Sequence, residues 1–112
     1  MATDSSLFSG SMTMLILKLL EQKDMYGYEM IDTLTQRSNN AFEMKAGTLY
    51  PLLHSLVQKK CLEVYQDDAS GKMRKYYHLT AVGQKILKEK TQTWHEYSKA
   101  VVRIIGGECY GN

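Results

Sequence analysis

The stretch AGTLYPLLHSL, residues 46–56, combines a regular apolar stripe with hydrogen-bonding side chains on the opposite side. Beginning at Leu49, leucines recur at the i, i+3, i+4 and i+7 spacing of a helix that buries one face. The other face carries Thr48, Tyr50 and His54, which can donate to a phosphate or reach a base edge. This pattern predicts a helix that contacts nucleic acid, although the same side chains would also suit an ordinary solvated surface.

Gly47 and Pro51 lie within this helical pattern, although both residue types weaken a helix interior. A glycine allows the backbone to approach a ligand closely, and a proline costs little in the first turn but about 3 kcal/mol further in. The penalty is small if the helix begins near Thr48. It is larger if the helix begins at Ala46, because the Gly47 carbonyl would then need a hydrogen bond from residue 51, and proline has no N–H to donate. We interpret both residues as keeping the helix start open to a phosphate.

Basic side chains also follow a polar turn at the tip of a predicted hairpin. Lys72, Arg74 and Lys75 are suited to phosphate contact or to insertion of an arginine into a minor groove. Two aspartates of the turn, Asp67 and Asp68, weaken the positive field there. A solvated turn that only improves solubility therefore remains the alternative.

An aromatic pair near the end of the chain predicts a small-molecule site. Trp94 and Tyr97, with Met14 and Ser98, could line a cavity, because an indole face stacks on flat aromatic cations and methionine adapts to varied shapes. The alternative is that Trp94 simply fills the core of a dimer.

The sequence shows no set of residues typical of catalysis. His54, His78 and His95 lie on three different predicted elements, and neither they nor the two cysteines have metal-ligand spacing. A glycine-rich phosphate loop and a nucleophile elbow are also missing from the sequence. We therefore expect neither an enzyme nor a metal or cofactor site. Cys61 and Cys109 are most simply reduced thiols of a cytoplasmic protein, with a disulfide as the alternative, and the sequence indicates no further role for either.

These residues must be positioned by a small set of elements. The apolar periodicity and turn residues predict helices over about 11–23, 26–37 and 46–60, strands over 62–65 and 75–79, and a last helix over 81–105. Thr80 is the expected N-cap of the last helix, which Gly106 and Gly107 should end. The first helix is apolar on two sides, which a single small domain can hardly cover, so we expect a second subunit against it.

Apolar residues of the last helix repeat every seven positions and predict a seam for another helix. One series consists of Leu87, Trp94 and Val101. A second series lies between its members and consists of Lys90, which is charged, followed by Tyr97 and Ile104. The predicted dimerisation residues are Met12, Leu15, Leu87, Trp94, Tyr97, Val101 and Ile104.

Composition and charge narrow the class of protein. The 112 residues, of which 44% are apolar and 23% charged, fit one globular domain, and no apolar run approaches the ~20 residues that cross a bilayer. The N-terminus lacks an export signal, so we expect a cytoplasmic protein without a membrane partner. Residues 1–44 carry a balance of −3 and residues 45–112 a balance of +5, so a polyanion would meet the second half.

Three blocks together resemble the PadR family of bacterial transcriptional regulators. They are YGYEMIDTL (26–34), GTLYPLLHSLVQKKCLE (47–63) and GKMRKYYHLTAVGQKIL (71–87), in this order and spacing, and the resemblance extends over about residues 12–105. The short tail is similar to the small subfamily, which dimerises through its first and last helices. Trp94, fourteen residues after Thr80, stands where the multidrug-sensing members place a tryptophan.

The resemblance implies a mainly α fold with a small β-hairpin, namely a winged helix-turn-helix with a long C-terminal dimerisation helix. We assign residues 1–80 to the DNA-binding domain, 81–107 to the dimerisation helix and 108–112 to a tail. The expected function is a homodimeric regulator, most simply a repressor, that binds a double-stranded, pseudo-palindromic operator and is released by a small aromatic or cationic effector. The alternative is a winged-helix module that binds a protein and no DNA. The predicted DNA-binding residues are Tyr26, Lys45, Gly47, Thr48, Tyr50, Pro51, His54, Lys72, Arg74 and Lys75.

Overall fold

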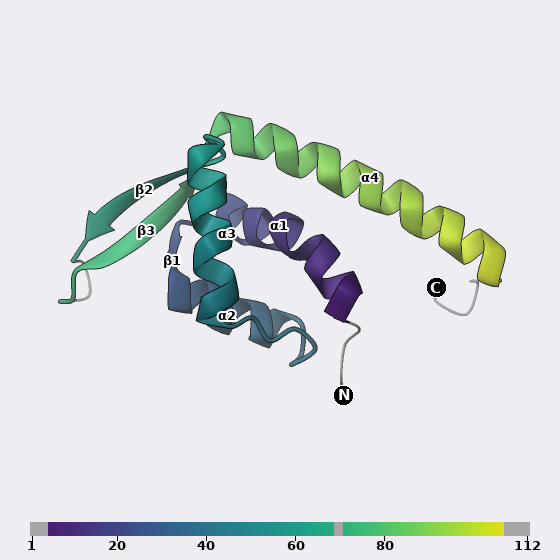
Figure 1. The fold of residues 1–112 in the computed structure, drawn as a ribbon, viewed down its shortest axis with the longest axis horizontal. Coiled ribbons are helices and arrows are strands. Elements are labelled where there is room, and N and C mark those ends of the chain that lie inside the picture. Colours follow the sequence, from purple (N-terminus) through teal and green to yellow (C-terminus); the bar gives the residue numbers. More distant parts are fainter. Residues whose placement is uncertain (1–4, 69–70, 107–112) are drawn as a thin grey trace.

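A computed structural model describes residues 5–68 and 71–106 (Figure 1). Over these residues the chain forms four helices and three strands. In chain order they are α1 (Ser5–Gln22), β1 (Met25–Tyr26), α2 (Gly27–Arg37), α3 (Ala46–Gln58), β2 (Leu62–Asp67), β3 (Arg74–Leu79) and α4 (Ala81–Ile105). Helices α1 to α3 gather beside the sheet, whereas α4 starts next to β3 and extends well beyond them (Figure 1). This is the winged helix-turn-helix with a long last helix that the sequence predicts.

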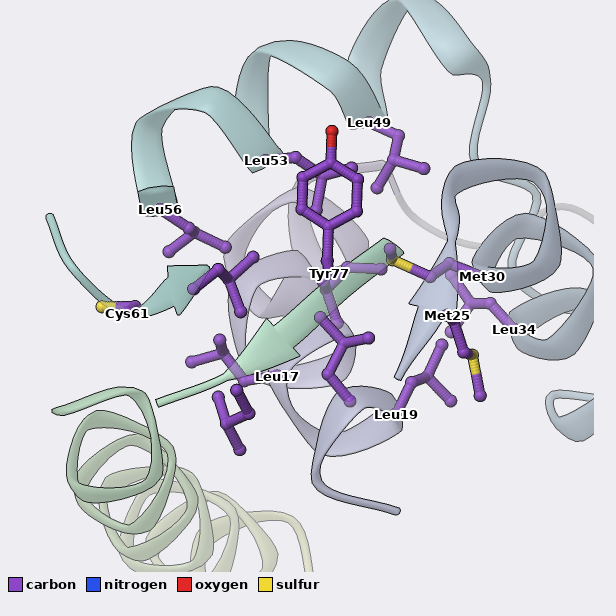
Figure 2. Close-up of a cluster of buried hydrophobic side chains, with 14 of the residues drawn as sticks. Leu17, Leu19, Met25, Met30, Leu34, Leu49, Leu53, Leu56, Cys61 and Tyr77 are labelled. Carbon is purple, nitrogen blue, oxygen red and sulfur yellow. The ribbon is translucent and has the colours of Figure 1, made fainter. Parts of the chain in front are cut away.

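The core lies between α3, the sheet, α1 and α2. Leu49, Leu53 and Leu56 of α3 are buried, and Tyr77 points from β3 toward that helix (Figure 2). Met30 and Leu34 of α2 complete this side. The apolar spacing read in α3 thus does form the buried face, because the helical period places these leucines on one stripe. No helix among the described residues combines the length and apolar character needed to cross a bilayer.

Helix α1 is covered by its own chain more fully than the sequence indicates. Ile16 and Leu17 are essentially inaccessible within a single chain, at 1% and 0% exposure, and Leu19 and Leu20 are also buried. The expectation that a second subunit must cover α1 is therefore wrong for its C-terminal half. The physical reason is that α1 contacts α2 and β3 as well as α4, so different faces meet different elements of the same chain.

The start of α1 also differs from the prediction. The helix begins at Ser5 and not near residue 11, so it includes Phe8, which is buried. The Phe8 ring stacks on the Phe42 ring, with 4.8 Å between the centroids. Phe42 lies in the connection between α2 and α3, where the sequence predicts no helix or strand. A contact across 34 positions thus extends the buried face of α1 by one turn.

The sheet has three strands in the order β1-β3-β2, where the sequence predicts only a two-stranded hairpin. The hairpin strands pair antiparallel from Leu62 with Leu79 to Asp67 with Arg74. The missed strand β1 pairs Met25 with Tyr77 and Tyr26 with Tyr76. Two residues have no alternation of their own to detect, so this strand exists only because β3 provides a partner.

Helix α4 has the predicted bounds and ends. The Thr80 side chain accepts a hydrogen bond from the Gly83 N–H at 3.0 Å, which makes Thr80 the N-cap. Gly106 closes the helix in the left-handed conformation, with φ of 76°. Gly107, Cys109 and the tail 108–112 lie outside the described residues.

The predicted seam of α4 is only partly open to a second helix. Leu87 is buried at 4% exposure in the core of its own chain and is therefore unavailable as a seam residue. Trp94, Tyr97 and Ile104, in contrast, are 49%, 63% and 86% exposed. Val101 is half-buried. The first residue of the heptad pattern, Leu87, therefore belongs to the core of its own chain, whereas the later residues form an exposed apolar face.

Candidate nucleic-acid interface

The outward face of α3 is a continuous polar stripe. Gly47, Thr48, Pro51, His54 and Gln58 are exposed, while the leucines on the other side are buried. Their spacing of three or four residues places them along one side of the helix. Four of the predicted contact positions, Gly47, Thr48, Pro51 and His54, are thereby brought to one surface, and Thr48 places a hydroxyl near the helix start.

Helix α3 begins at Ala46, so Pro51 is its sixth residue and lies beyond the first turn. Thr48 and Leu49 donate their backbone N–H groups to the Lys45 carbonyl, both at 2.9 Å. Pro51 has no N–H to offer the Gly47 carbonyl, so the costlier of the two sequence alternatives applies. Stability alone therefore gives no reason for a proline at this position of an exposed stripe.

The N-terminus of α3 is also left without a side-chain cap. Its N-cap residue is Lys45, whose side chain makes no cap hydrogen bond, and the N-cap of α2, Tyr26, makes none either. Helix α4, by contrast, is capped by Thr80. The first N–H groups of a helix need partners and carry the positive end of the helix dipole. The two uncapped starts are therefore suited to phosphate oxygens.

Tyr50 has a packing role that the sequence does not indicate. Its ring lies against the start of α2 so closely that a Cβ atom on Gly27 would be 2.2 Å from Tyr50 Oη. The residue is half-buried, and this burial raises the pKa of Tyr50 above the ordinary value. Tyr50 thus joins α2 to α3, and only part of it is left for an outside partner. The only trace of this contact in the sequence is Gly27, and the reason for a glycine there becomes clear only in the fold.

Arg74 is held at the start of α2 by aromatic rings. Its guanidinium lies 4.3 Å from the centroid of Tyr26, a cation–π distance. Tyr26 in turn meets Tyr76 edge to face, with 5.6 Å between the centroids. Two predicted contact residues, Tyr26 and Arg74, thereby share one spot beside the uncapped α2. Lys72 and Lys75 are exposed on the hairpin.

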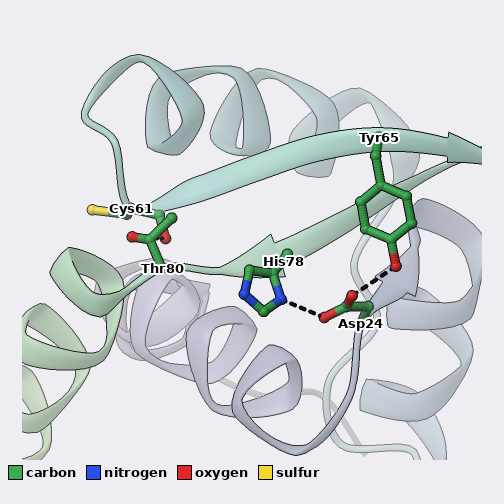
Figure 3. Close-up of polar contacts among 5 residues, drawn as sticks. All are labelled: Asp24, Cys61, Tyr65, His78 and Thr80. Atoms are coloured by element: carbon green, nitrogen blue, oxygen red, sulfur yellow. Dashed lines mark hydrogen bonds and ion pairs between the residues drawn. The ribbon is translucent and has the colours of Figure 1, made fainter.

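A carboxylate joins the hairpin to the end of α1, and sequence reasoning misses it. Tyr65 of β2 donates its hydroxyl to Asp24 Oδ2 at 2.6 Å, and His78 Nδ1 lies 2.9 Å from Asp24 Oδ1 (Figure 3). Burial alone would raise the pKa of Asp24, but these two hydrogen bonds outweigh it and lower that pKa. The hydrogen bond to Asp24 raises the pKa of Tyr65 to about 12. The Asp24 contact fixes both hairpin strands relative to α1.

A cavity of about 470 Å³ lies between α1 and α4, away from this surface. Met14, Trp94 and Tyr97 line it as the sequence predicts, whereas Ser98 does not. Glu89 and Lys90 add one negative and one positive side chain to a lining that is otherwise apolar or uncharged. Its further lining residues are Ser6, Leu7, Gly10, Ser11 and Thr93. Phe8, in contrast, points into the core.

Metal-binding side chains do not gather anywhere in the part of the chain that the structure describes. No three His, Cys, Asp or Glu side chains lie close enough to hold an ion. The three histidines stand on α3, β3 and α4 respectively. Cys61 is buried after the end of α3.

Comparison with known proteins gives one consistent result. The sequence profile of a family described as transcriptional regulator PadR-like matches residues 16–89. An uncharacterised protein of Lysinibacillus sphaericus is 37% identical over 104 residues, which cover 92% of this chain and 95% of that protein.

Solved structures of regulators resemble the whole fold. A PadR-like transcriptional regulator from Bacillus cereus is 31% identical with a TM-score of 0.81, over 92% of this chain and 99% of that one. A PadR family transcription regulator from Clostridium difficile is 33% identical with a TM-score of 0.76, over 85% and 98% of the two chains. Both similarities must include at least part of α4, because the share of this chain that they leave out is shorter than that helix.

Proposed function

The chain belongs to the PadR-like family of transcriptional regulators, and from this premise we propose that it is a homodimeric repressor of a pseudo-palindromic operator. As a family member it is a DNA-binding regulator and not an enzyme. In the proposed complex two copies of α3 enter successive major grooves, as helix-turn-helix dimers do. Residues 1–80 would form the reading unit, α4 would hold the two units together, and the protein would act in the cytoplasm.

The observation that carries this proposal is the polar stripe of α3 at an uncapped helix start. Thr48 and His54 are exposed on it, and Lys45 stands at its N-cap. Side chains near the start of a recognition helix contact base edges, while free N–H groups and lysines contact phosphates. Gly47 has no Cβ and would let the DNA backbone approach the helix start, and Pro51 presents only a short ring on the exposed stripe.

The test is a gel shift or anisotropy titration with the DNA upstream of the protein's own gene. Affinity should fall by about 10³-fold or more between ~50 and ~200 mM salt, because each neutralised phosphate releases counterions. Lys45→Ala should weaken binding and reduce the salt slope by about 1. Lys99→Ala removes the same charge from an exposed site on α4 and should leave the slope unchanged. Equal effects of the two variants would refute the α3 assignment.

The rival function, a winged-helix module that binds only another protein, gives a different result in the same titration. Wild type would then show no salt-sensitive affinity for any duplex, and His54→Ala would change nothing. A reporter gene downstream of the bound DNA separates a repressor from an activator. Higher reporter output after deletion of the regulator supports repression.

The exposed apolar end of α4 supports a dimer. Tyr97 and Ile104 belong to one heptad series and are 63% and 86% exposed, and apolar side chains exposed together along one helix mark an interaction site. We expect Ile104→Glu to convert the dimer into a monomer in sedimentation velocity. Val82→Glu also replaces an exposed aliphatic side chain of α4 by glutamate, but outside the heptad series, so this variant should remain a dimer. A monomeric wild type would contradict this part of the proposal.

The cavity between α1 and α4 supports a flat aromatic cation as effector. Trp94 and Tyr97 offer ring faces that attract a flat cation, Met14 offers an adaptable wall, and Glu89 offers a carboxylate, although Lys90 also lines the cavity. An acridinium dye should quench Trp94, the only tryptophan, in the absence of DNA. Glu89→Gln should lower the affinity for this cation more than the affinity for a neutral acridine of the same shape. Equal losses for both probes would exclude the proposed role of the carboxylate.

A further inference from the structure

Helices α3 and α4 are both bonded to one buried residue, Cys61, which follows the end of α3. Its N–H donates to the Leu56 carbonyl in the last turns of α3 at 2.9 Å. Its carbonyl accepts the N–H of Thr80, the N-cap of α4, at 3.1 Å. Cys61 is only 4% exposed, so water does not compete for these groups. The backbone of a single residue therefore ties the end of the reading helix to the start of the long helix.

The Thr80 hydroxyl adds a second link between the same two segments. It accepts the Gly83 N–H at 3.0 Å, as a helix N-cap does. Its own proton is directed to two main-chain carbonyls, that of Lys60 at 2.6 Å and that of Cys61 at 3.0 Å. Figure 3 shows Thr80 beside Cys61. Capping needs only the first of these contacts. The donated proton instead fixes the start of α4 to the segment that ends α3.

Gly83 shows how closely the first turn of α4 rests on this segment. A Cβ atom there would be 2.3 Å from the Cys61 carbonyl oxygen and 2.5 Å from Leu79 Cδ1. The Cys61 carbonyl is backbone and is held by Thr80, so it cannot turn aside as a flexible side chain would. Only glycine allows this approach, and this is the reason that the position lacks the Glu or Gln of a capping box.

The same helix forms one wall of the cavity further along. The residues of α4 that line the cavity lie between Glu89 and Tyr97. The first of them, Glu89, is six residues from Gly83, which is about 9 Å along the helix at 1.5 Å per residue. Helix α4 is continuous over this distance, and α1 forms the opposite wall. A turn of α4 against α1 at the cavity therefore has to move Cys61 and the end of α3 as well.

We propose that Thr80 and Gly83 are positioning residues that couple the α1–α4 cavity to the reading helix through Cys61. This inference rests on the proposed function, since it concerns how α3 is placed on DNA. By linkage, the coupling must act in both directions. Operator binding at α3 should thus alter the surroundings of Trp94, although Trp94 itself need not touch DNA.

The experiment follows Trp94 emission during titration with the operator duplex, at a protein concentration where the dimer is complete. In the wild type the emission maximum should shift as the operator saturates. Thr80→Val keeps the shape of the side chain but loses the hydroxyl, so the operator should still bind while the shift is lost. Thr80→Ser keeps the hydroxyl and should retain the shift. Circular dichroism at the same temperature verifies that each variant is folded.

The outcomes separate this inference from the proposed function. A wild type that binds the operator without any change at Trp94 would overturn the coupling and leave the DNA-binding proposal intact. A folded Thr80→Val that keeps the full shift would also overturn it, because a purely structural role predicts lower stability with an unchanged shift. If Thr80→Val does not fold, Thr80→Asp provides the test, because an aspartate still accepts the Gly83 N–H as an N-cap but has no proton for the Lys60 and Cys61 carbonyls. Absence of operator binding by the wild type would instead refute the proposed function.

Discussion

The contact between Gly27 and Tyr50 yields a quantitative prediction about the reading unit. A Cβ atom on Gly27 would lie 2.2 Å from Tyr50 Oη and 2.6 Å from Cζ, whereas unstrained carbon contacts are about 3.5–4.0 Å. In Gly27→Ala the tyrosine ring must therefore move out of its place. Overpacking of this kind costs about 1–3 kcal/mol. Gly27 is the first residue of α2, so alanine regains little of the about 0.5–1 kcal/mol that it gains over glycine in a helix interior, and the net loss should stay at about 1–3 kcal/mol.

A double-mutant cycle isolates this contact. In a Tyr50→Ala background the obstacle is gone, and Gly27→Ala should then be neutral or slightly stabilising. The coupling energy between the two sites should be about 1–3 kcal/mol. Tyr50→Phe removes only the hydroxyl and leaves Cζ at 2.6 Å, so Gly27→Ala should still destabilise that background.

Urea unfolding followed by circular dichroism measures the four free energies of the cycle. All samples need the same protein concentration, because the stability of an oligomer depends on it. A coupling below about 0.5 kcal/mol would mean that the two residues act independently. In that case the explanation of Gly27 as a site shaped by Tyr50 would be refuted.

Three further predictions concern the hairpin and the core. Because the folded-state pKa of Tyr65 is raised to about 12, the unfolded chain ionises first, and wild type should lose stability between about pH 10 and pH 12. Tyr65→Phe should lack this component in urea midpoints across that range, and coincident pH profiles would contradict the Asp24 hydrogen bond. Changing Lys72 and Lys75 together to Gln should reduce the salt slope of operator binding by about 1–2, and an unchanged slope would exclude hairpin contact with phosphate. Leu53→Ala, at a site with 0% exposure, should cost about 2–5 kcal/mol in unfolding, whereas a loss no larger than that of exposed Gln58→Ala would contradict the assigned core.

Much of the helical structure could be predicted from short-range patterns. The leucine spacing of α3 identifies its buried face, and Thr80 and Gly106 mark both ends of α4. These signals are local, because a helix hydrogen-bonds within four residues and its ends are set by the nearest side chains. Strand β1 could not be found in this way, since its two residues become a strand only beside β3.

The candidate interface likewise contains residues whose placement the local pattern predicts and residues whose placement depends on distant contacts. The outward stripe of Thr48, Pro51 and His54 follows from the helical period, whereas the roles of the surrounding residues depend on distant partners. Tyr65 and His78 reach Asp24 across 41 and 54 positions of the chain. No spacing rule connects residues so far apart, so neither the Asp24 contact nor the placement of Arg74 over Tyr26 could be foreseen.

The family, the order of the helices and the outward face of α3 can all be inferred from short stretches of the sequence. That α1 is covered largely by its own chain, that Leu87 belongs to the core and that Tyr50 packs on Gly27 becomes visible only in the folded chain. The reason is physical: helical period and capping act over a few residues, and are therefore visible in a short stretch of sequence. Burial depends on which distant segments meet, and Gly27 and Gly83 acquire their meaning only where another backbone or ring approaches them.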